Sequence, residues 1–106
     1  MGLRLIPVVF RFPASLVPTA RCASLIATFN GWDPRAHPMT KTSSGEWYTT
    51  VYLPPGRVLY CIWVDGTSWL DPHDEGRVPN GWGSEYSVRR VRSDEAALAS
   101  RDPALP

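Results

Sequence analysis

The chain has 106 residues, which corresponds to one domain with a single hydrophobic core. Lys and Arg total 11 against 10 Asp and Glu, so the basic surplus with which proteins bind nucleic acid or anionic membranes is absent. Five Trp, four Tyr, 11 Pro and eight Gly favour short strands and tight turns over a helical bundle. The composition therefore predicts a small, nearly neutral β domain that binds neither nucleic acid nor membranes.

Apolar periodicity predicts the strands. The clearest segments, in chain order, are residues 8–12, 21–29, 46–53, 58–64 and 86–91. Short strands joined by tight turns, roughly six or seven in all, are typical of an immunoglobulin-like antiparallel sandwich. The predicted fold class is therefore an all-β, immunoglobulin-like β-sandwich.

Turn residues separate these strands. Asp65-Gly66 follows the densest apolar run and is a strong hairpin signal, whereas residues 73–84 are polar and Gly-rich and are expected to form a long surface loop. Residues 93–106 contain few large apolar side chains and are expected to form a flexible tail. The predicted organisation is a sandwich domain over residues 1–92 followed by a tail over residues 93–106.

Cys22 and Cys61 both lie in apolar, strand-like segments, which predicts two buried free thiols, with a disulfide as the alternative. The N-terminal segment contains neither a run of about 20 apolar residues nor the cleavage site of a signal peptide. We therefore expect a cytoplasmic protein.

Six short segments carry the most specific signal, because they occur in order and at nearly fixed spacing. They are Phe29-Asn30-Gly31-Trp32-Asp33, Gly45-Glu46-Trp47, Leu53-Pro54-Pro55-Gly56, Val64-Asp65-Gly66, Trp69-Leu70-Asp71-Pro72 and Asn80-Gly81-Trp82-Gly83-Ser84. Together they resemble carbohydrate-binding module family 48, the early-set domain of isoamylases and glycogen-branching enzymes. The glycogen-binding domain of the AMP-activated protein kinase β subunit belongs to the same family. With no catalytic barrel in the sequence, the chain looks most similar to stand-alone bacterial early-set proteins.

The resemblance implies a carbohydrate-binding surface. A Trp indole presents a flat face that matches the apolar C–H face of a glucose ring. By resemblance, Trp32 and Trp69 match the two tryptophans that stack on α-glucan in the kinase domain. Trp82 falls where that domain has a leucine that threads the glucan, Ser84 falls on the neighbouring threonine, and Asn80 belongs to the same expected binding loop. The implied ligand is an α-glucan such as glycogen or starch, or a malto-oligosaccharide, and the implied partner is a glycogen-metabolising enzyme.

The other tryptophans have a structural explanation. Trp47 alternates with Val51 on the expected core face, and Trp63 lies in the densest apolar strand, so both are expected to pack. Trp82 fits two roles equally, since it could bind sugar or cap one end of the sandwich.

Two positions depart from the family pattern. Cys61 stands where the family often has a Lys that bonds sugar hydroxyls, and a thiol is a poor donor. Tyr86 stands where the family favours an Asn in the last loop. These departures predict weaker affinity or a different saccharide. They also support the alternative function, a protein-interaction domain that has lost sugar binding.

Catalysis is not expected. A glycosidase needs two carboxylates placed across the scissile bond, and Asp71, Asp74 and Glu75 instead cluster in one predicted solvated loop. His73 beside these acids is too little for a metal site. We therefore expect a non-catalytic domain with no metal and no cofactor.

Overall fold

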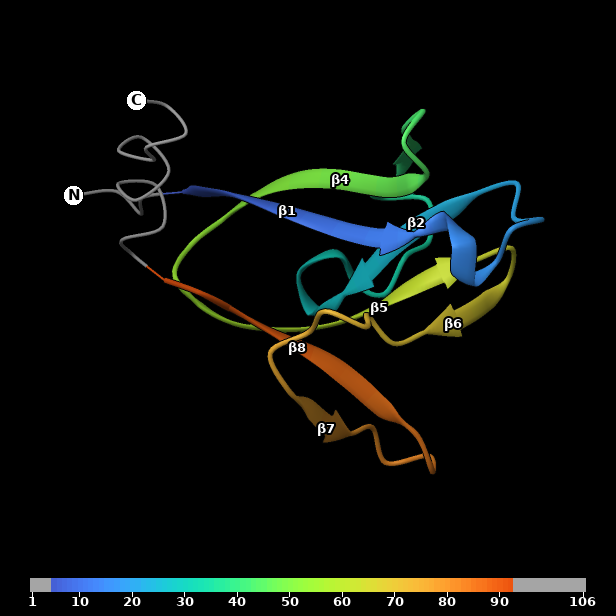
Figure 1. The fold of residues 1–106 in the computed structure, drawn as a ribbon. Coiled ribbons are helices and arrows are strands. Elements are labelled where there is room, and N and C mark those ends of the chain that lie inside the picture. Colours follow the sequence, from blue (N-terminus) through green and yellow to red (C-terminus); the bar gives the residue numbers. More distant parts are fainter. Residues whose placement is uncertain (1–4, 93–106) are drawn as a thin grey trace.

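The computed structural model describes residues 5–92 as a sandwich of two antiparallel β-sheets (Figure 1). The strands are β1 (Ile6–Pro13), β2 (Ala23–Ala27), β3 (Thr40–Lys41), β4 (Glu46–Leu53), β5 (Gly56–Val64), β6 (Thr67–Trp69), β7 (Arg77–Pro79) and β8 (Glu85–Val91). Two short 3-10 helices follow β1 and β2: η1 (Ala14–Leu16) and η2 (Thr28–Asn30). The predicted all-β sandwich is confirmed, and the tail expected over residues 93–106 lies outside the described residues. Within residues 5–92, no helix is long and apolar enough to cross a membrane.

β5 is the strand around which the larger sheet is organised. The smaller sheet has the order β1-β4-β3, and the larger one has the order β2-β5-β8-β7 (Figure 1). One edge of β5 pairs with β2, while its other edge pairs first with β8 and then with β6. Residues 37–39 run along the free edge of β2, where the Leu25 N–H donates to the His37 carbonyl and the Met39 N–H donates to the Ala23 carbonyl. β5 is therefore the centre of the larger sheet.

The core lies between the sheets and is built by every second residue of the long strands, because side chains alternate across a strand. Phe10 of β1 and Tyr60 of β5 meet edge to face in its centre, with ring centroids 4.9 Å apart. Trp47 is buried, which confirms its expected packing role. The buried strand positions of the core are Ile6, Val8, Phe10, Phe12, Ala23, Leu25, Ala27, Trp47, Val51, Leu53, Val58, Tyr60, Ile62, Val64 and Val91.

The predicted hairpin at Asp65-Gly66 is confirmed. β5 and β6 are joined by these two residues alone, and both have a positive φ, 47° and 87°, as a type I′ turn requires. The Asp65 carboxylate accepts the backbone N–H groups of Cys22, at 2.9 Å, and Arg21, at 3.0 Å. These bonds tie the turn to the start of β2 and lower the pKa of Asp65.

The segment expected to be one long surface loop contains a strand. β7, over Arg77–Pro79, pairs with β8 from Arg77↔Ser87 to Pro79↔Glu85. The expectation was wrong because three residues are too few to show a period of two, and an edge strand needs only one neighbour to form.

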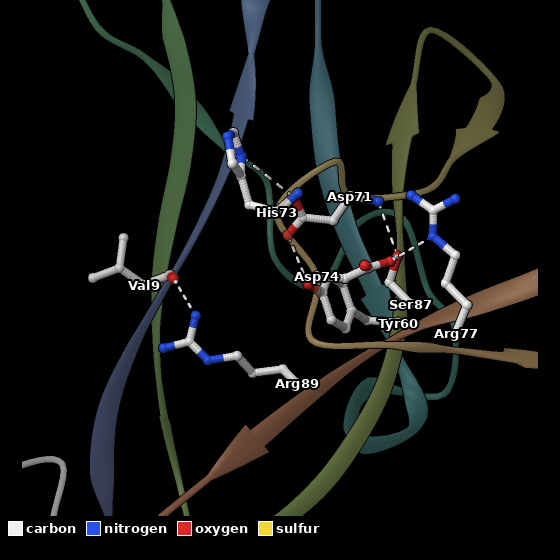
Figure 2. A network of polar contacts seen from close by, with 8 residues as sticks. All are labelled: Val9, Tyr60, Asp71, His73, Asp74, Arg77, Ser87 and Arg89. Carbon is white, nitrogen blue, oxygen red and sulfur yellow. Dashed lines mark hydrogen bonds and ion pairs between the residues drawn. The ribbon is translucent and has the colours of Figure 1, made fainter.

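Asp71 was expected in a solvated loop, but it is buried, with 5% of its surface exposed. Figure 2 shows the polar network to which it belongs. Its Oδ2 accepts the Tyr60 hydroxyl at 2.6 Å, and its Oδ1 accepts the His73 backbone N–H at 2.8 Å. The Ser87 hydroxyl accepts the Asp71 backbone N–H and donates to Asp74 Oδ2 at 2.8 Å. Burial and the bond to Asp71 raise the pKa of Tyr60. The network holds the segment after β6 against the end of the core.

We expect Tyr60→Phe to reduce the free energy of unfolding by about 1–3 kcal/mol, because it leaves a buried carboxylate oxygen without its donor. The matched control is Tyr52→Phe, in which the hydroxyl removed belongs to a side chain that is 63% exposed. Urea denaturation of both variants measures the difference. Equal stability of the two variants would show that the Tyr60–Asp71 bond contributes nothing.

Candidate functional site

The candidate site lies on the outer face of the larger sheet, which is the side of β2, β5, β6 and β8 turned away from the core. Paired residues of neighbouring strands point to the same side of the sheet, and the pairs Tyr60↔Ser87 and Leu25↔Ile62 point into the core. The residues that alternate with these along each strand therefore point outward. We call this the outer face and define it by Ser24, Ile26, Leu59, Cys61, Trp63, Ser68, Tyr86 and Val88.

Trp32 is held next to the outer face by the turn that follows η2. The Asn30 Oδ1 accepts the backbone N–H groups of Ala27, at 2.9 Å, and Trp32, at 3.1 Å, while its Nδ2 donates to the Leu25 carbonyl. This network supports a positive φ at both Gly31 and Trp32, of 67° and 61°. A left-handed conformation is unfavourable for a bulky residue and persists where surrounding contacts impose it. Asn30 therefore fixes where the indole of Trp32 projects.

The indole of Trp32 stacks on Tyr86 of β8. The ring centroids are 4.6 Å apart and the planes are inclined by 21°, so the two rings lie nearly parallel. Both side chains are half-buried, and stacking covers only one face of each ring. Tyr86, which by sequence was a departure that removed a polar contact, thus enlarges the aromatic surface at Trp32.

Trp82 is the most exposed large apolar side chain among the described residues, at 82%. It lies in the turn between β7 and β8, which Asn80 organises: Asn80 Oδ1 accepts the backbone N–H groups of Trp82, at 2.8 Å, and Ser84, at 3.2 Å. The alternative that Trp82 caps the sandwich end is therefore wrong. The carbonyl oxygen of Asn80 is already used by the turn, so Asn80 positions the loop, and Ser84 lies exposed beside Trp82.

Trp69 does not lie on the outer face, and the expectation that it occupies an exposed loop was wrong. It ends β6, pairs with Ile62 and packs against the core, with its ring 5.9 Å from that of Phe12. The two-residue turn at Asp65-Gly66 is the reason, because it directs Ser68 outward and Trp69 inward. The structure brings Trp32, Tyr86 and the turn of Trp82 to one end of β8 and leaves Trp69 on the other side of the sheet.

Trp63 also lies on the outer face, so the expectation that it packs in the core was wrong. It is half-buried and lies between Ser24 on β2 and Ser68 on β6. The signal that identifies it is the alternation within β5, where Tyr60, Ile62 and Val64 face the core, so that Trp63 must face away.

The two thiols differ. Cys61 is buried on the outer face, with its Sγ 3.9 Å from the Glu85 carbonyl, and burial raises the pKa of its thiol. Cys22 is exposed, so the expectation of two buried thiols was wrong for this residue. Cys22 precedes β2 at the sandwich end, where only Asp65 of the neighbouring turn contacts its side chain among the described hydrogen bonds. Both thiols are free.

The acidic residues after β6 are engaged in structural contacts. Asp74 Oδ2 accepts the Arg77 guanidinium at 2.9 Å (Figure 2), and Glu75 accepts the backbone N–H of Arg90 at 2.7 Å. The bonds from Arg90 and from the Arg92 guanidinium lower the pKa of Glu75. Among residues 5–92, no three His, Cys, Asp or Glu side chains are grouped so that they could hold a metal ion.

We expect Trp69→Ala to lower the free energy of unfolding by about 2–4 kcal/mol, because it opens a cavity beside Phe12. Trp82→Ala removes an equally large side chain from an exposed turn and is expected to leave stability within about 0.5 kcal/mol of the wild type. Chemical denaturation followed by circular dichroism compares the two. The opposite ranking would show that the two tryptophans have been assigned to the wrong sides of the sheet.

A thiol reagent is expected to modify one cysteine rapidly in the native protein and the second only after denaturation. Exposure makes Cys22 the fast site, whereas Cys61 is shielded and has a smaller thiolate fraction because its pKa is raised. Cys22→Ser identifies the fast site by abolishing the rapid phase. Two rapid phases in the native protein would contradict the burial of Cys61.

The fold is an antiparallel β-sandwich of the immunoglobulin-like class, and aromatic rings lie on the outer face of its larger sheet. Residues 14–76, more than half of the chain, match the family model of carbohydrate-binding module 48 (isoamylase N-terminal domain), and the chain belongs to this family. It is also 53% identical over 34 residues to a 1,4-alpha-glucan-branching enzyme of Aspergillus oryzae (strain ATCC 42149 / RIB 40). That match covers 32% of this chain and 5% of the enzyme. Trp82 and Tyr86 lie beyond the family match, so their place in the site rests on geometry.

Proposed function

We propose that this chain is a non-catalytic module that binds α-glucan, such as glycogen, starch or a malto-oligosaccharide, on the outer face. The observation that carries the proposal is the Trp32–Tyr86 stack, with ring centroids 4.6 Å apart and both side chains half-buried. Membership of family 48 supports an α-glucan as the ligand class.

Stacking supplies most of the binding energy in this proposal. A glucose ring buries its C–H face on an indole, while its hydroxyl edge remains in water. Cys61, next to Tyr86 in the register of β5 and β8, is buried, and its thiol is a weak donor that already contacts the Glu85 carbonyl, so few polar contacts add to stacking. We therefore expect a Kd of roughly 10 μM to 1 mM, about −7 to −4 kcal/mol, with little dependence on salt because the ligand is neutral.

The acidic residues support a binding role over a catalytic one. Asp71 is buried and bonded to Tyr60, while Asp74 is paired with Arg77. A general acid and its partner carboxylate must instead reach a substrate from two sides. The likeness to a branching enzyme supports a glycogen-metabolising enzyme as the catalytic partner, acting on the glucan to which this module binds.

One observation favours the second candidate, a protein-interaction domain. Tyr48 and Tyr52 project from β4 on the outer side of the smaller sheet, 39% and 63% exposed. Exposed aromatic side chains on a sheet are also typical of protein contacts. That surface lies on the opposite side of the sandwich from Trp32, so the two functions use different residues.

Trp32→Ala tests the proposal. We expect it to weaken binding to maltoheptaose by about 1–3 kcal/mol, the range for truncation of an aromatic anchor. Retention on insoluble glycogen and calorimetric titration at low and high salt measure this effect. Tyr52→Ala, on the smaller sheet, is the matched control and should bind like the wild type.

The opposite result, loss of retention in Tyr52→Ala but not in Trp32→Ala, would transfer the site to the smaller sheet. Failure of the wild-type protein to bind any glucan would favour the protein-interaction domain. A near-ultraviolet circular dichroism spectrum of each variant verifies that a loss of binding is not a loss of folding.

A further inference from the structure

Trp63 presents an aromatic ring on the outer face without contributing to the core. Its cross-strand neighbours are Ser24 on β2 and Ser68 on β6. Cross-strand neighbours are the side chains that normally cover a ring on a sheet, and two serines are too short to do so. The indole is accordingly only half-buried, at a place where a large apolar surface is unfavourable unless something binds to it.

Strand geometry relates Trp63 to the Trp32–Tyr86 stack. The pair Tyr60↔Ser87 places Tyr86 beside Cys61 on the neighbouring strand, and Trp63 follows Cys61 by two residues on the same face. With about 3.3 Å per residue and 4.8 Å between strands, the Cα atoms of Tyr86 and Trp63 are separated by about 8 Å. This separation between Cα atoms is wider than one sugar ring, so the two aromatic positions suit different units of one glucan chain.

The surface between the two aromatic positions suits a neutral polymer. Cys61 lies there, with Ile26 as its cross-strand neighbour on β2, and both side chains are uncharged and apolar. Ser68 is exposed at the side of Trp63, where its hydroxyl can exchange hydrogen bonds with a sugar hydroxyl.

We propose that Trp63 is a second stacking platform, and that the outer face therefore binds several consecutive glucose units of a chain rather than a single sugar. The inference rests on the proposed function and deepens it. Ligand units on Trp32–Tyr86 and on Trp63 are covalently linked, so binding at one platform raises the effective concentration at the other. Affinity should consequently rise with chain length until both platforms are occupied.

The experiment compares Trp63→Phe with Trp63→Leu in titrations with maltose and maltoheptaose. Both variants keep an apolar side chain at a half-buried position, but only Phe keeps a flat face. We expect the Leu variant to bind maltoheptaose about tenfold more weakly than the wild type, and the Phe variant to recover most of that loss. Maltose, which is too short to gain fully from both platforms, should show a smaller difference between the variants.

Nuclear magnetic resonance of the five indole N–H groups provides a direct readout in the wild-type protein. The Trp63→Phe spectrum identifies the Trp63 signal, which should shift when maltoheptaose is added, as should that of Trp32. The signals of Trp47 and Trp69, which pack against the core, serve as internal controls and should move little.

Two outcomes overturn the inference. If Trp63→Leu binds maltoheptaose like the wild type and the Trp63 signal stays in place, while Trp32→Ala loses binding, Trp63 is no platform and the proposed function stands. If wild-type protein binds neither maltoheptaose nor glycogen, the proposed function itself fails and the inference fails with it.

Discussion

Alternation along β5 is the constraint on which both the core and the candidate site depend. Tyr60 and Ile62 face inward and meet the smaller sheet, while Cys61 and Trp63 face outward between β2 and the two strands on the other edge. A shift of one residue in this register would exchange the two sets and bury the wrong side of the strand. The same pairing that excludes water from the core therefore also decides which tryptophans can meet a ligand.

Asp and Asn side chains fix the loops around β5 by accepting hydrogen bonds from the backbone. Asn30 shapes the turn of Trp32, Asn80 shapes the turn of Trp82, and Asp65 ties its hairpin to the start of β2. Each side chain accepts backbone N–H groups that the strands leave unpaired, which is why short polar residues are favoured at these positions. The register of β5 thus decides which strand residues belong to the candidate site, and local hydrogen bonds position the loops beside it.

Trp69 and Tyr86 show that a difference of one position along a strand decides whether an aromatic side chain packs in the core or faces outward. The Asp65-Gly66 turn uses two residues, so the third residue beyond it points into the core, and Trp69 becomes a packing residue against Phe12. Tyr86 lies one position away from an inward-facing serine and so faces outward, where it meets Trp32. Similar sequence motifs cannot distinguish the inward-facing Trp69 from the outward-facing Tyr86, because motif spacing does not report the side of the strand on which a residue lies.

Much of the fold was determined by the sequence itself. The alternation within residues 46–53 and 58–64, the Asp65-Gly66 turn and the burial of Trp47 follow from local patterns that leave few alternatives. Three features could not be predicted, because each depends on a partner that is distant in sequence. The strand β7 forms beside β8, and the buried Asp71 is held by Tyr60 and Ser87. The exposed Cys22 is placed by the Asp65 turn. The stack of Trp32 on Tyr86 is of the same kind, since 54 positions of chain separate two rings that only the pairing of β2, β5 and β8 brings together. Tertiary structure decided these features because contacts between distant segments are set by how the sheets assemble, which no local pattern of residues encodes.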